Sequence, residues 1–251
     1  MLLADLEGTV ARSGGHVIAR RHRLHRGPGL PTIDFEEREL NILACHTAQL
    51  NDVCMNGGAA LLRNIFSTHT DRCVILSTFD LVKVRHNVSD ANLWESVAPS
   101  QYWLRDIWIL PIHRERPGHW VLCKIMCRSH ELLLFDSLAD RDPWCDEIHD
   151  IMMLIQRLVF LATQHGHKLY LIPQGWVARP LLVSPSFLEP LTSHNPAQTQ
   201  ACQTNGYDCG LWVLASIGAS LRGFHRAVLR EQDISRFRGI LQQLITSLPT
   251  T

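Results

Sequence analysis

Three consecutive apolar runs of strand length, separated by polar turns, occupy the centre of the chain. They cover residues 107–113, 119–126 and 131–136. Apolar runs of this length with turn residues at their ends predict strands joined as hairpins. Shorter runs of the same character predict two further strands, over residues 73–78 and 169–173.

Apolar residues recur at helical spacing on both sides of this central block. The spacing predicts helices over residues 35–45, 53–66, 145–164, 209–221 and 233–248. Asn51 and Asp52 offer an N-cap for the second helix, and Gly57-Gly58 within it indicates the close approach of another backbone. Helices around a central hairpin block predict the α+β class, with a mostly antiparallel sheet flanked by helices.

The N-terminal segment has a different character. Residues 8–31 are interrupted by glycine and proline and include the basic run Arg20-Arg21-His22-Arg23. This composition is typical of an irregular segment, so we expect a flexible basic arm over residues 1–31 and one globular domain over residues 32–251. The basic run fits a nuclear-import signal, although such runs more often belong to ordinary solvated tails.

Composition narrows the class of protein. With 251 residues and 46% apolar content, the chain can bury one domain core of ordinary size. The 24 Lys and Arg balance the 24 Asp and Glu, so charge gives no reason to expect nucleic acid as a partner. No apolar run approaches the roughly 20 residues of a membrane helix, and Asp5 and Glu7 interrupt any signal-peptide pattern. We expect a monomeric intracellular protein, nuclear or cytoplasmic.

The cysteines are dispersed along the chain. Their number, 8, and their wide spacing favour free thiols in a reducing compartment over a disulfide framework. Cys123 and Cys127 are spaced like a pair of zinc ligands, but on a strand their sulfur atoms would lie about 13 Å apart. That separation is too large for one ion, so we expect no metal and no cofactor.

One cysteine has surroundings that indicate a reactive thiol. Cys209 follows a turn-forming Asn205-Gly206 pair and begins an apolar helix. A thiol in the first turn of a helix faces unpaired backbone N–H groups and the positive end of the helix dipole, which favour the thiolate. Gln203, six residues upstream, is a candidate hydrogen-bond donor to a developing oxyanion.

The second central hairpin supplies a candidate base and a candidate carboxylate for this thiol. Side chains alternate along a strand, and two of the possible registers bring His119 and Asp136 onto one face. With Met126 opposite Ser129 they lie directly opposite each other, and with Met126 opposite Glu131 they lie on a diagonal. An intermediate register would place them on opposite faces.

The four residues together fit the roles of thiol catalysis. A carboxylate at Asp136 that accepts the Nδ1–H of His119 would leave Nε2 of the ring to deprotonate Cys209. Each residue alone also has a plain structural interpretation, such as a strand-start histidine or a packed cysteine. Their joint occurrence favours the catalytic interpretation.

These residues resemble the signature of the ubiquitin-like-protein-specific cysteine proteases, which include the SUMO and NEDD8 deconjugating enzymes and, more distantly, the adenovirus protease. The resemblance covers roughly residues 45–225. Its motifs are His119-Trp120, Asp136-Ser137-Leu138, the box from Gln203 to Gly210, Leu50-Asn51-Asp52 and Leu110-Pro111-Ile112-His113. Divergent members of this kind are often found in eukaryotic transposable elements, and the chain is similar to them.

The resemblance implies an adenain-like fold and a Cys-His-Asp triad that cleaves after the Gly-Gly-like tail of a ubiquitin-like modifier, by deconjugation or processing. It implies His119 as general base, Asp136 as its orienter and Cys209 as nucleophile. Gln203 and the Cys209 backbone N–H would be the oxyanion donors. The modifier or its conjugates would be the partner.

The resemblance also implies a substrate-binding set, which comprises Trp120, Asn51, Asp52 and Gly210. Trp120 would close over the tail and exclude residues with side chains, but the spacing fits a core tryptophan on the opposite strand face equally well. The family usually carries a second tryptophan directly before the Leu50-Asn51-Asp52 element, and this chain has Gln49 there.

Two other functions use the same residues. One is acyl transfer or proteolysis of an unrelated protein by the same triad. The other is a non-catalytic module that binds a modifier, against which the presence of all four residues argues.

Overall fold

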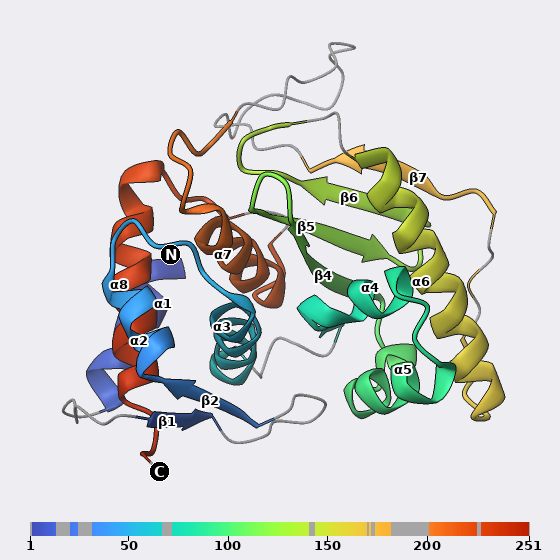
Figure 1. Ribbon diagram of the computed structural model, residues 1–251, viewed down its shortest axis with the longest axis horizontal. Coiled ribbons are helices and arrows are strands. Elements are labelled where there is room, and N and C mark those ends of the chain that lie inside the picture. The colour runs from blue at the N-terminus through green and yellow to red at the C-terminus, as the bar shows by residue number, and fades with distance from the viewer. Residues whose placement is uncertain are drawn as a thin grey trace.

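The computed structural model describes residues 2–13, 21–24, 32–66, 72–140, 144–169, 171, 174–181, 201–224 and 227–250. Within these residues, a five-stranded sheet lies between two groups of helices (Figure 1). The sheet therefore has a core on each face.

The sheet has the order β3 (Cys73–Ile75), β4 (Ile107–Arg114), β5 (His119–Met126), β6 (Glu131–Phe135) and β7 (Val177–Pro180). The three central strands pair antiparallel, whereas β3 and β7 run parallel to their neighbours. Because side chains alternate between the faces, Trp120 and Leu122 pack into one core while Val121 and Cys123 pack into the other.

The first helix group contains the most deeply buried helix. In Figure 1, α3 (Asp52–Ile65) and α7 (Cys209–Leu221) lie next to the sheet, and α1 (Leu2–Ser13), α2 (Glu37–Ala44) and α8 (Glu231–Thr246) lie outside them. All residues of α7 are buried, as expected of a helix that is apolar on every side. The antiparallel pair β1 (Arg21–Leu24) and β2 (Ile33–Glu36) lies at the edge of this group.

The second helix group contains α4 (Thr78–Arg85), α5 (Asp90–Val97) and α6 (Trp144–Gln164) (Figure 1). The 3-10 turns η2 (Ala98–Ser100) and η3 (Tyr102–Leu104) follow α5 in the chain and precede β4. Stacked aromatic rings join α5 and η3 to the segment that follows α6. The rings of Trp94 and Trp103 stack at 5.4 Å, and each also stacks at 3.8 Å on a histidine beyond the end of α6, His165 and His167 respectively.

The predicted α+β class is confirmed, and β5 and α7 have the predicted bounds. The other predicted helices and central strands end within 2 residues of the predicted positions. Several described elements were not predicted: the N-terminal α1 and β1, and also β2, α4, α5, η2, η3 and β7. Of the predicted strand over residues 169–173, Leu169 and Leu171 are not in a strand, and residues 170, 172 and 173 lie outside the described residues.

The prediction of an irregular N-terminal arm is wrong for its described parts. Residues 8–13 belong to α1, and residues 21–24 form β1, which pairs with β2. Leu2, Leu3 and Leu6 of α1 lie in the same core as α7 and α8, and the burial of these three side chains stabilises the helix. Residues 14–20 and 25–31 lie outside the described residues, and the domain boundary at residue 31 stays a prediction.

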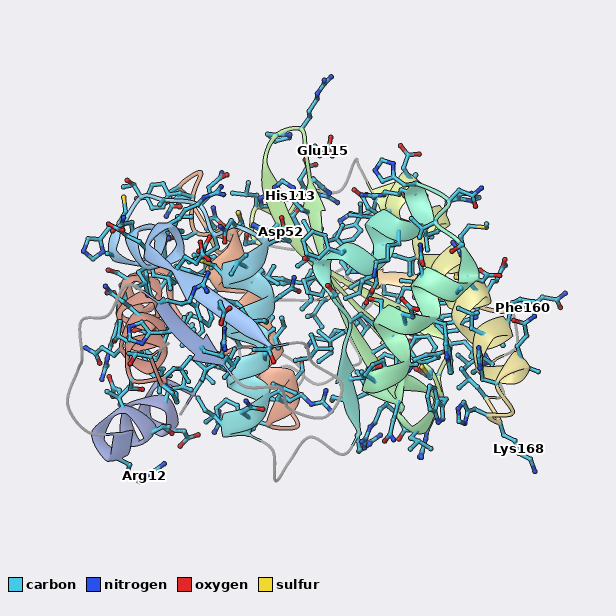
Figure 2. The ribbon with its side chains drawn as sticks, turned by 60° about the horizontal axis from the view of Figure 1, so that its bottom comes forward. Arg12, Asp52, His113, Glu115, Phe160 and Lys168 are labelled. Carbon is cyan, nitrogen blue, oxygen red and sulfur yellow. The ribbon has the colours of Figure 1, made fainter. Side chains whose placement is uncertain are left out.

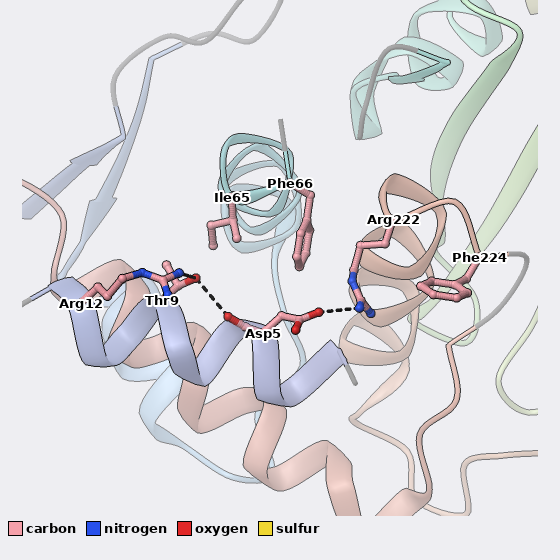
Figure 3. Close-up of a pocket in the computed structure, with 7 residues that line it drawn as sticks. All are labelled: Asp5, Thr9, Arg12, Ile65, Phe66, Arg222 and Phe224. Atoms are coloured by element: carbon pink, nitrogen blue, oxygen red, sulfur yellow. Dashed lines mark hydrogen bonds and ion pairs between the residues drawn. The ribbon is translucent and has the colours of Figure 1, made fainter. Parts of the chain in front are cut away.

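A cavity of about 430 Å³ lies where α1 meets the ends of α3 and α7 (Figure 3). Asp5 of α1 forms an ion pair of 2.5 Å with Arg222, directly after α7. The Arg222 guanidinium also lies over the rings of Phe66, at 5.6 Å, and Phe224, at 5.1 Å. These contacts fasten α1 to the C-terminal end of α7.

The glycine pair in α3 permits the close approach of side chains, which corrects the expected approach of a backbone. A Cβ atom at Gly57 would lie 2.2 Å from the ring of Phe35 in β2, and one at Gly58 would lie 2.8 Å from Leu214 in α7. The two glycines therefore let α3 pack against both neighbours. In the described parts of the chain, no helix has the length and apolarity needed to cross a membrane.

Candidate active site

Cys209 is the first residue of α7, and a hydrogen-bonded turn fixes its position. The Asn205 Oδ1 atom accepts from the backbone N–H groups of Tyr207, at 3.1 Å, and Asp208, at 3.0 Å. Its amide group donates to Asp208 Oδ2 at 2.9 Å. Cys209 is 1% exposed and lies at the positive end of the dipole of a fully buried helix.

A buried arginine of α8 anchors Asp208, the residue before Cys209. Arg238 is 1% exposed, and its guanidinium donates to Asp208 Oδ1 at 3.2 Å. It also donates to the backbone carbonyls of Ile42, Cys45 and Ala48, at 2.8 to 3.1 Å. The start of α7 is thereby held against the segment that leads from α2 to α3.

His119 and Asp136 meet at the end of the second hairpin. Met126 pairs with Glu131, which is the second of the two predicted registers and places His119 and Asp136 on a diagonal. His119 Nε2 lies 2.8 Å from Asp136 Oδ1, and both side chains are buried. The Leu138 backbone N–H donates to the same carboxylate oxygen at 2.9 Å, which fixes the orientation of the carboxylate.

The two ring nitrogens have the reverse of the predicted roles. Nε2, the nitrogen farther from the backbone, reaches across to Asp136, so Nδ1 is left for Cys209. Burial alone would lower the pKa of His119, but hydrogen bonds to Asp136 and Cys209 and their negative charges outweigh it and raise this pKa to about 9. The imidazolium is therefore stabilised next to the thiol.

Gln203 is buried against Ser137, the residue after Asp136. Its side-chain carbonyl accepts from the Ser137 hydroxyl at 2.7 Å, and its amide donates to the Asn205 carbonyl at 2.5 Å. The backbone N–H groups of Cys202 and Gln203 both donate to the Ser137 carbonyl. These bonds join the loop before Cys209 to the loop after Asp136.

Cys202 lies near the same carboxylate and differs from Cys209 in its environment. Burial is the largest cause that raises the pKa of the Cys202 thiol, to about 12, and the charges of Asp136 and Glu231 add to it. A thiol of this kind is neutral at physiological pH and is a poor nucleophile.

Trp120 and Asn51 make structural contacts. Trp120 is 3% exposed, its indole N–H donates to the Leu50 carbonyl at 2.8 Å, and its ring lies 4.7 Å from that of His113. The Asn51 side chain caps α3 by accepting from the Cys54 N–H, and it donates to Glu39, so its polar atoms are engaged within the protein. A substrate-binding role for both stays a prediction.

Gly210 and Asp52 lie at the contact of α3 with α7. A Cβ atom at Gly210 would lie 3.0 Å from Met55 and 3.1 Å from Leu50, so the glycine allows the two helix starts to approach. Asp52 is half-buried at the start of α3, and Figure 2 shows it on the same side of the molecule as His113 and the hairpin tip at Glu115. Their substrate-binding role also stays a prediction.

Gln49 joins the two loops that carry the predicted catalytic residues. Its side-chain amide donates to the Gly118 carbonyl, at 3.1 Å, and to the Gly206 carbonyl, at 2.7 Å. Gly118 directly precedes His119, and Gly206 lies in the turn before Cys209. At the position where the resemblance leads one to expect tryptophan, this chain has a polar side chain that bridges the two loops.

Two charged residues near Asp136 were not predicted from the sequence: Arg114, which contacts it, and Glu147, which contacts Arg114. Arg114, at the end of β4, donates to Asp136 at 2.8 Å and to Glu147 of α6 at 3.0 Å. The sequence placed Arg114 in a turn, and its position directly after an apolar strand next to a histidine was the one available signal. Among the residues that the structure describes, no group of three or more His, Cys, Asp or Glu side chains is placed to hold a metal ion.

The geometry is suited to nucleophilic catalysis by a thiol. A nucleophile at a helix N-terminus, an imidazole beside it and a carboxylate on the far ring nitrogen are the parts that such catalysis requires. Backbone N–H groups at the start of α7 lie next to the thiol, where the oxyanion of an acyl-transfer intermediate would form.

Comparison with known proteins identifies the class and then the family. The fold is that of a cysteine peptidase of the ubiquitin-like protein protease type. Residues 51–248 match the family described as "Ulp1 protease family, C-terminal catalytic domain". The chain belongs to the Ulp1 protease family. The comparison with curated protein sequences gives no match.

Solved structures of low sequence identity share the fold. SUMO protease Ulp1 with its catalytic cysteine oxidised to a sulfonic acid is 18% identical with a TM-score of 0.61, over 98% of this chain and 94% of that one. The Ulp1-like SUMO protease catalytic domain of Chaetomium thermophilum is 16% identical with a TM-score of 0.64, over 96% and 88%. The C-terminal Ulp1 protease domain in complex with Smt3, the yeast ortholog of SUMO, is 16% identical with a TM-score of 0.57, over 98% and 93%.

Proposed function

We propose that this protein cleaves the bond after the Gly-Gly-like C-terminal tail of a SUMO-type ubiquitin-like modifier, in deconjugation or in processing. The observation that carries the proposal is the buried contact of His119 with Asp136, next to Cys209 at the start of α7. Membership of the Ulp1 protease family and the fold shared with a Ulp1 domain bound to Smt3 support the choice of substrate.

Cys209 acts as the nucleophile and His119 as the general acid and base. The thiolate sulfur attacks the carbonyl carbon of the tail's last residue, and the imidazolium gives its proton to the leaving amine as the C–N bond breaks. Water, deprotonated by His119, then hydrolyses the thioester and restores the thiol. Asp136 holds the ring and stabilises its charged form.

The oxyanion of each tetrahedral intermediate accepts hydrogen bonds from the Cys209 backbone N–H and from the Gln203 amide. One hydrogen of this amide bonds to the Asn205 carbonyl, and the amide has a second hydrogen that can bond to the oxyanion. We also propose Trp120, Asn51, Asp52 and Gly210 as the substrate-binding set, as the resemblance implies. Gln49 bridges the loops before His119 and Cys209.

The test is hydrolysis of a panel of ubiquitin-like modifiers, each carrying a fluorogenic amide at its C-terminus. We expect turnover of a SUMO-type modifier, and a loss of about 10²- to 10³-fold in kcat for Gln203→Ala. Asp136→Asn should lower kcat by several orders of magnitude while leaving modifier binding intact. If the wild type binds a modifier as tightly as Cys209→Ala does but never cleaves it, the proposal is wrong and the protein is a modifier-binding module. Acetylation of Cys209 by acetyl-CoA would favour acyl transfer.

A further inference from the structure

A chain of buried charges extends from the proposed catalytic residues to helix α6. Arg114 at the end of β4 pairs with His119 in the strand register, so it lies beside the histidine. Its Nη1 atom donates to Asp136 Oδ2 at 2.8 Å, and its Nε atom donates to Glu147 Oε1 at 3.0 Å. The three side chains Arg114, Asp136 and Glu147 are 6%, 3% and 7% exposed.

Arg114 completes the restraint on the Asp136 carboxylate. Oδ1 of this carboxylate accepts from His119 and from the Leu138 N–H, so Oδ2 is the oxygen that needs a further partner when buried. Arg114 supplies it. The guanidinium is itself held by Glu147 and by the ring of Trp144, whose centroid lies 4.5 Å away. Rotation of the carboxylate would break a charged hydrogen bond on each oxygen.

Positive and negative charges alternate along this series of buried side chains, from His119 through Asp136 and Arg114 to Glu147. The positive charge of Arg114 near Asp136 weakens the attraction of this carboxylate for the imidazolium of His119. Glu147, bonded to the other side of the guanidinium, partly neutralises that charge. In the described part of the chain, the Cys209 thiol lies against His119, and the Cys202 thiol, which Glu231 also influences, lies near Asp136.

We propose that Arg114 is a positioning residue that orients the Asp136 carboxylate, and that Glu147 of α6 balances its charge so that His119 stays protonated beside Cys209. This inference rests on the proposed roles of Asp136 and His119. It makes α6, on the far face of the sheet from α7, a supporting element of the site (Figure 1).

The test is the titration of the His119 side chain by NMR, with its signals assigned by comparison with His119→Gln. Arg114→Gln should raise the pKa of His119 because it removes a nearby positive charge, and Glu147→Gln should lower it because it removes a negative one. The two opposite shifts should each be about half a unit or more, by the size of charge effects between partly buried neighbours. Arg114→Lys, which keeps the charge, should titrate close to the wild type.

Kinetics supply a second measurement for the same variants. Arg114→Gln should lower kcat about 10- to 100-fold with little change in KM, the usual cost of losing a partner that orients a catalytic ligand. Arg157→Gln is the matched control, since Arg157 of α6 pairs with Asp90 at 2.5 Å, away from the site. It should leave both the pKa of His119 and kcat unchanged.

Titration needs no substrate, so it decides the inference separately from the proposed function. If circular dichroism shows that Arg114→Gln does not fold, the pKa of His119 in Glu147→Gln tests the inference by itself, because this substitution keeps the shape of the side chain. An unchanged or raised pKa of His119 in Glu147→Gln would overturn the inference. So would equal shifts in Arg114→Gln and Arg157→Gln.

Discussion

At the scale of single residues, the site depends on how one imidazole is held between a thiol and a carboxylate. Nε2 of His119 bonds to Asp136 and leaves Nδ1 for Cys209. The sequence could predict that these side chains meet in two of the possible hairpin registers, because side chains alternate along each strand, but it left the register itself open. It could not predict which nitrogen meets which partner, because that depends on the rotation of the ring about its Cβ bond.

The raised pKa of His119 predicts how the protein responds to alkali. Since hydrogen bonds and charges of Asp136 and Cys209 outweigh burial and raise it to about 9, kcat/KM should fall as the pH rises through about 9. The same shift affects folding, because the folded-state pKa lies above the unfolded value of about 6.5. Its contribution to the free energy of unfolding is complete below about pH 6.5 and is lost as the pH rises through about 9.

Urea unfolding from pH 6 to pH 10 checks this response, with His119→Gln as the reference. The difference in unfolding free energy between the two proteins should shrink as the pH rises. A constant difference over this range would show that the ring gains no proton affinity on folding.

Gln49 is the second residue whose effect can be predicted from its contacts. It donates two hydrogen bonds across the site, to Gly118 and Gly206, and each such bond contributes about 1 kcal/mol. Gln49→Ala should therefore lower kcat/KM about tenfold or more, because the loops before His119 and Cys209 lose their restraint. Steady-state kinetics of the modifier substrate measure this.

The matched control for Gln49 is Gln156→Ala, at an exposed position of α6. It should leave kcat/KM as in the wild type. Equal values for the two variants would mean that the Gln49 bridge has no part in catalysis.

At the scale of elements, the contact of α3 with α7 positions Cys209, the proposed nucleophile. Gly58 and Gly210 permit this contact, with Leu214 and Met55 as their side-chain neighbours, and Gly57 lets α3 pack against Phe35 of β2. The second hairpin works in the same way, since one register of the two strands decides where His119 and Asp136 meet. Sheet and helices thus bring together three residues that are far apart in the chain.

The close packing at Gly57 predicts a large effect of a small substitution. Gly57→Ala would place a methyl group 2.2 Å from the buried Phe35 ring, so it should destabilise the protein by roughly 1 to 3 kcal/mol as overpacking does. Gly239→Ala, in α8 with no atom within 4 Å of its Cβ position, should instead stabilise by up to about 1 kcal/mol through helix propensity. Chemical denaturation gives both values, and a loss of stability no larger at Gly57 than at Gly239 would refute the packing argument.

What the sequence could predict depends on the distance over which each feature is determined. Local patterns in the sequence predict the bounds of β5 and α7, the turn before Cys209 and the presence of the hairpin formed by β5 and β6. The bond from Arg114 to Glu147 spans 33 residues, and that from Gln49 to Gly206 spans 157, so neither leaves a local pattern. The short helices α4 and α5 had cap signals at Ser77 and Ser89 but lacked long apolar periodicity.

At the scale of the whole molecule, both ends of the described chain support the catalytic core. Arg238 of α8 holds Asp208 and the segment before α3, and α1 packs with its leucines in the same core. Sequence composition suggested an arm outside the domain, because glycine and basic residues between the short elements obscured the apolar side of α1. Tertiary burial at Leu2, Leu3 and Leu6 outweighed that local composition.

The burial of α1 predicts that it contributes to global stability. Leu6 is 0% exposed, so Leu6→Ala should destabilise the protein by about 2 to 5 kcal/mol, as truncation of a buried leucine does. Leu104→Ala is the matched control, because Leu104 is 62% exposed and should change stability by less than about 0.5 kcal/mol. Thermal and urea unfolding measure both. If both substitutions change the free energy of unfolding by similarly small amounts, α1 does not unfold together with the rest of the domain.

The central claim is that Cys209, activated by His119, attacks the tail of a SUMO-type modifier. The most direct measurement is intact-protein and peptide mass spectrometry after incubation with such a modifier bearing a C-terminal electrophile. We predict a one-to-one adduct on Cys209 in the wild type, slower adduct formation in His119→Gln and none in Cys209→Ser. Absence of an adduct with every ubiquitin-like modifier, or its formation on another cysteine, would contradict the account.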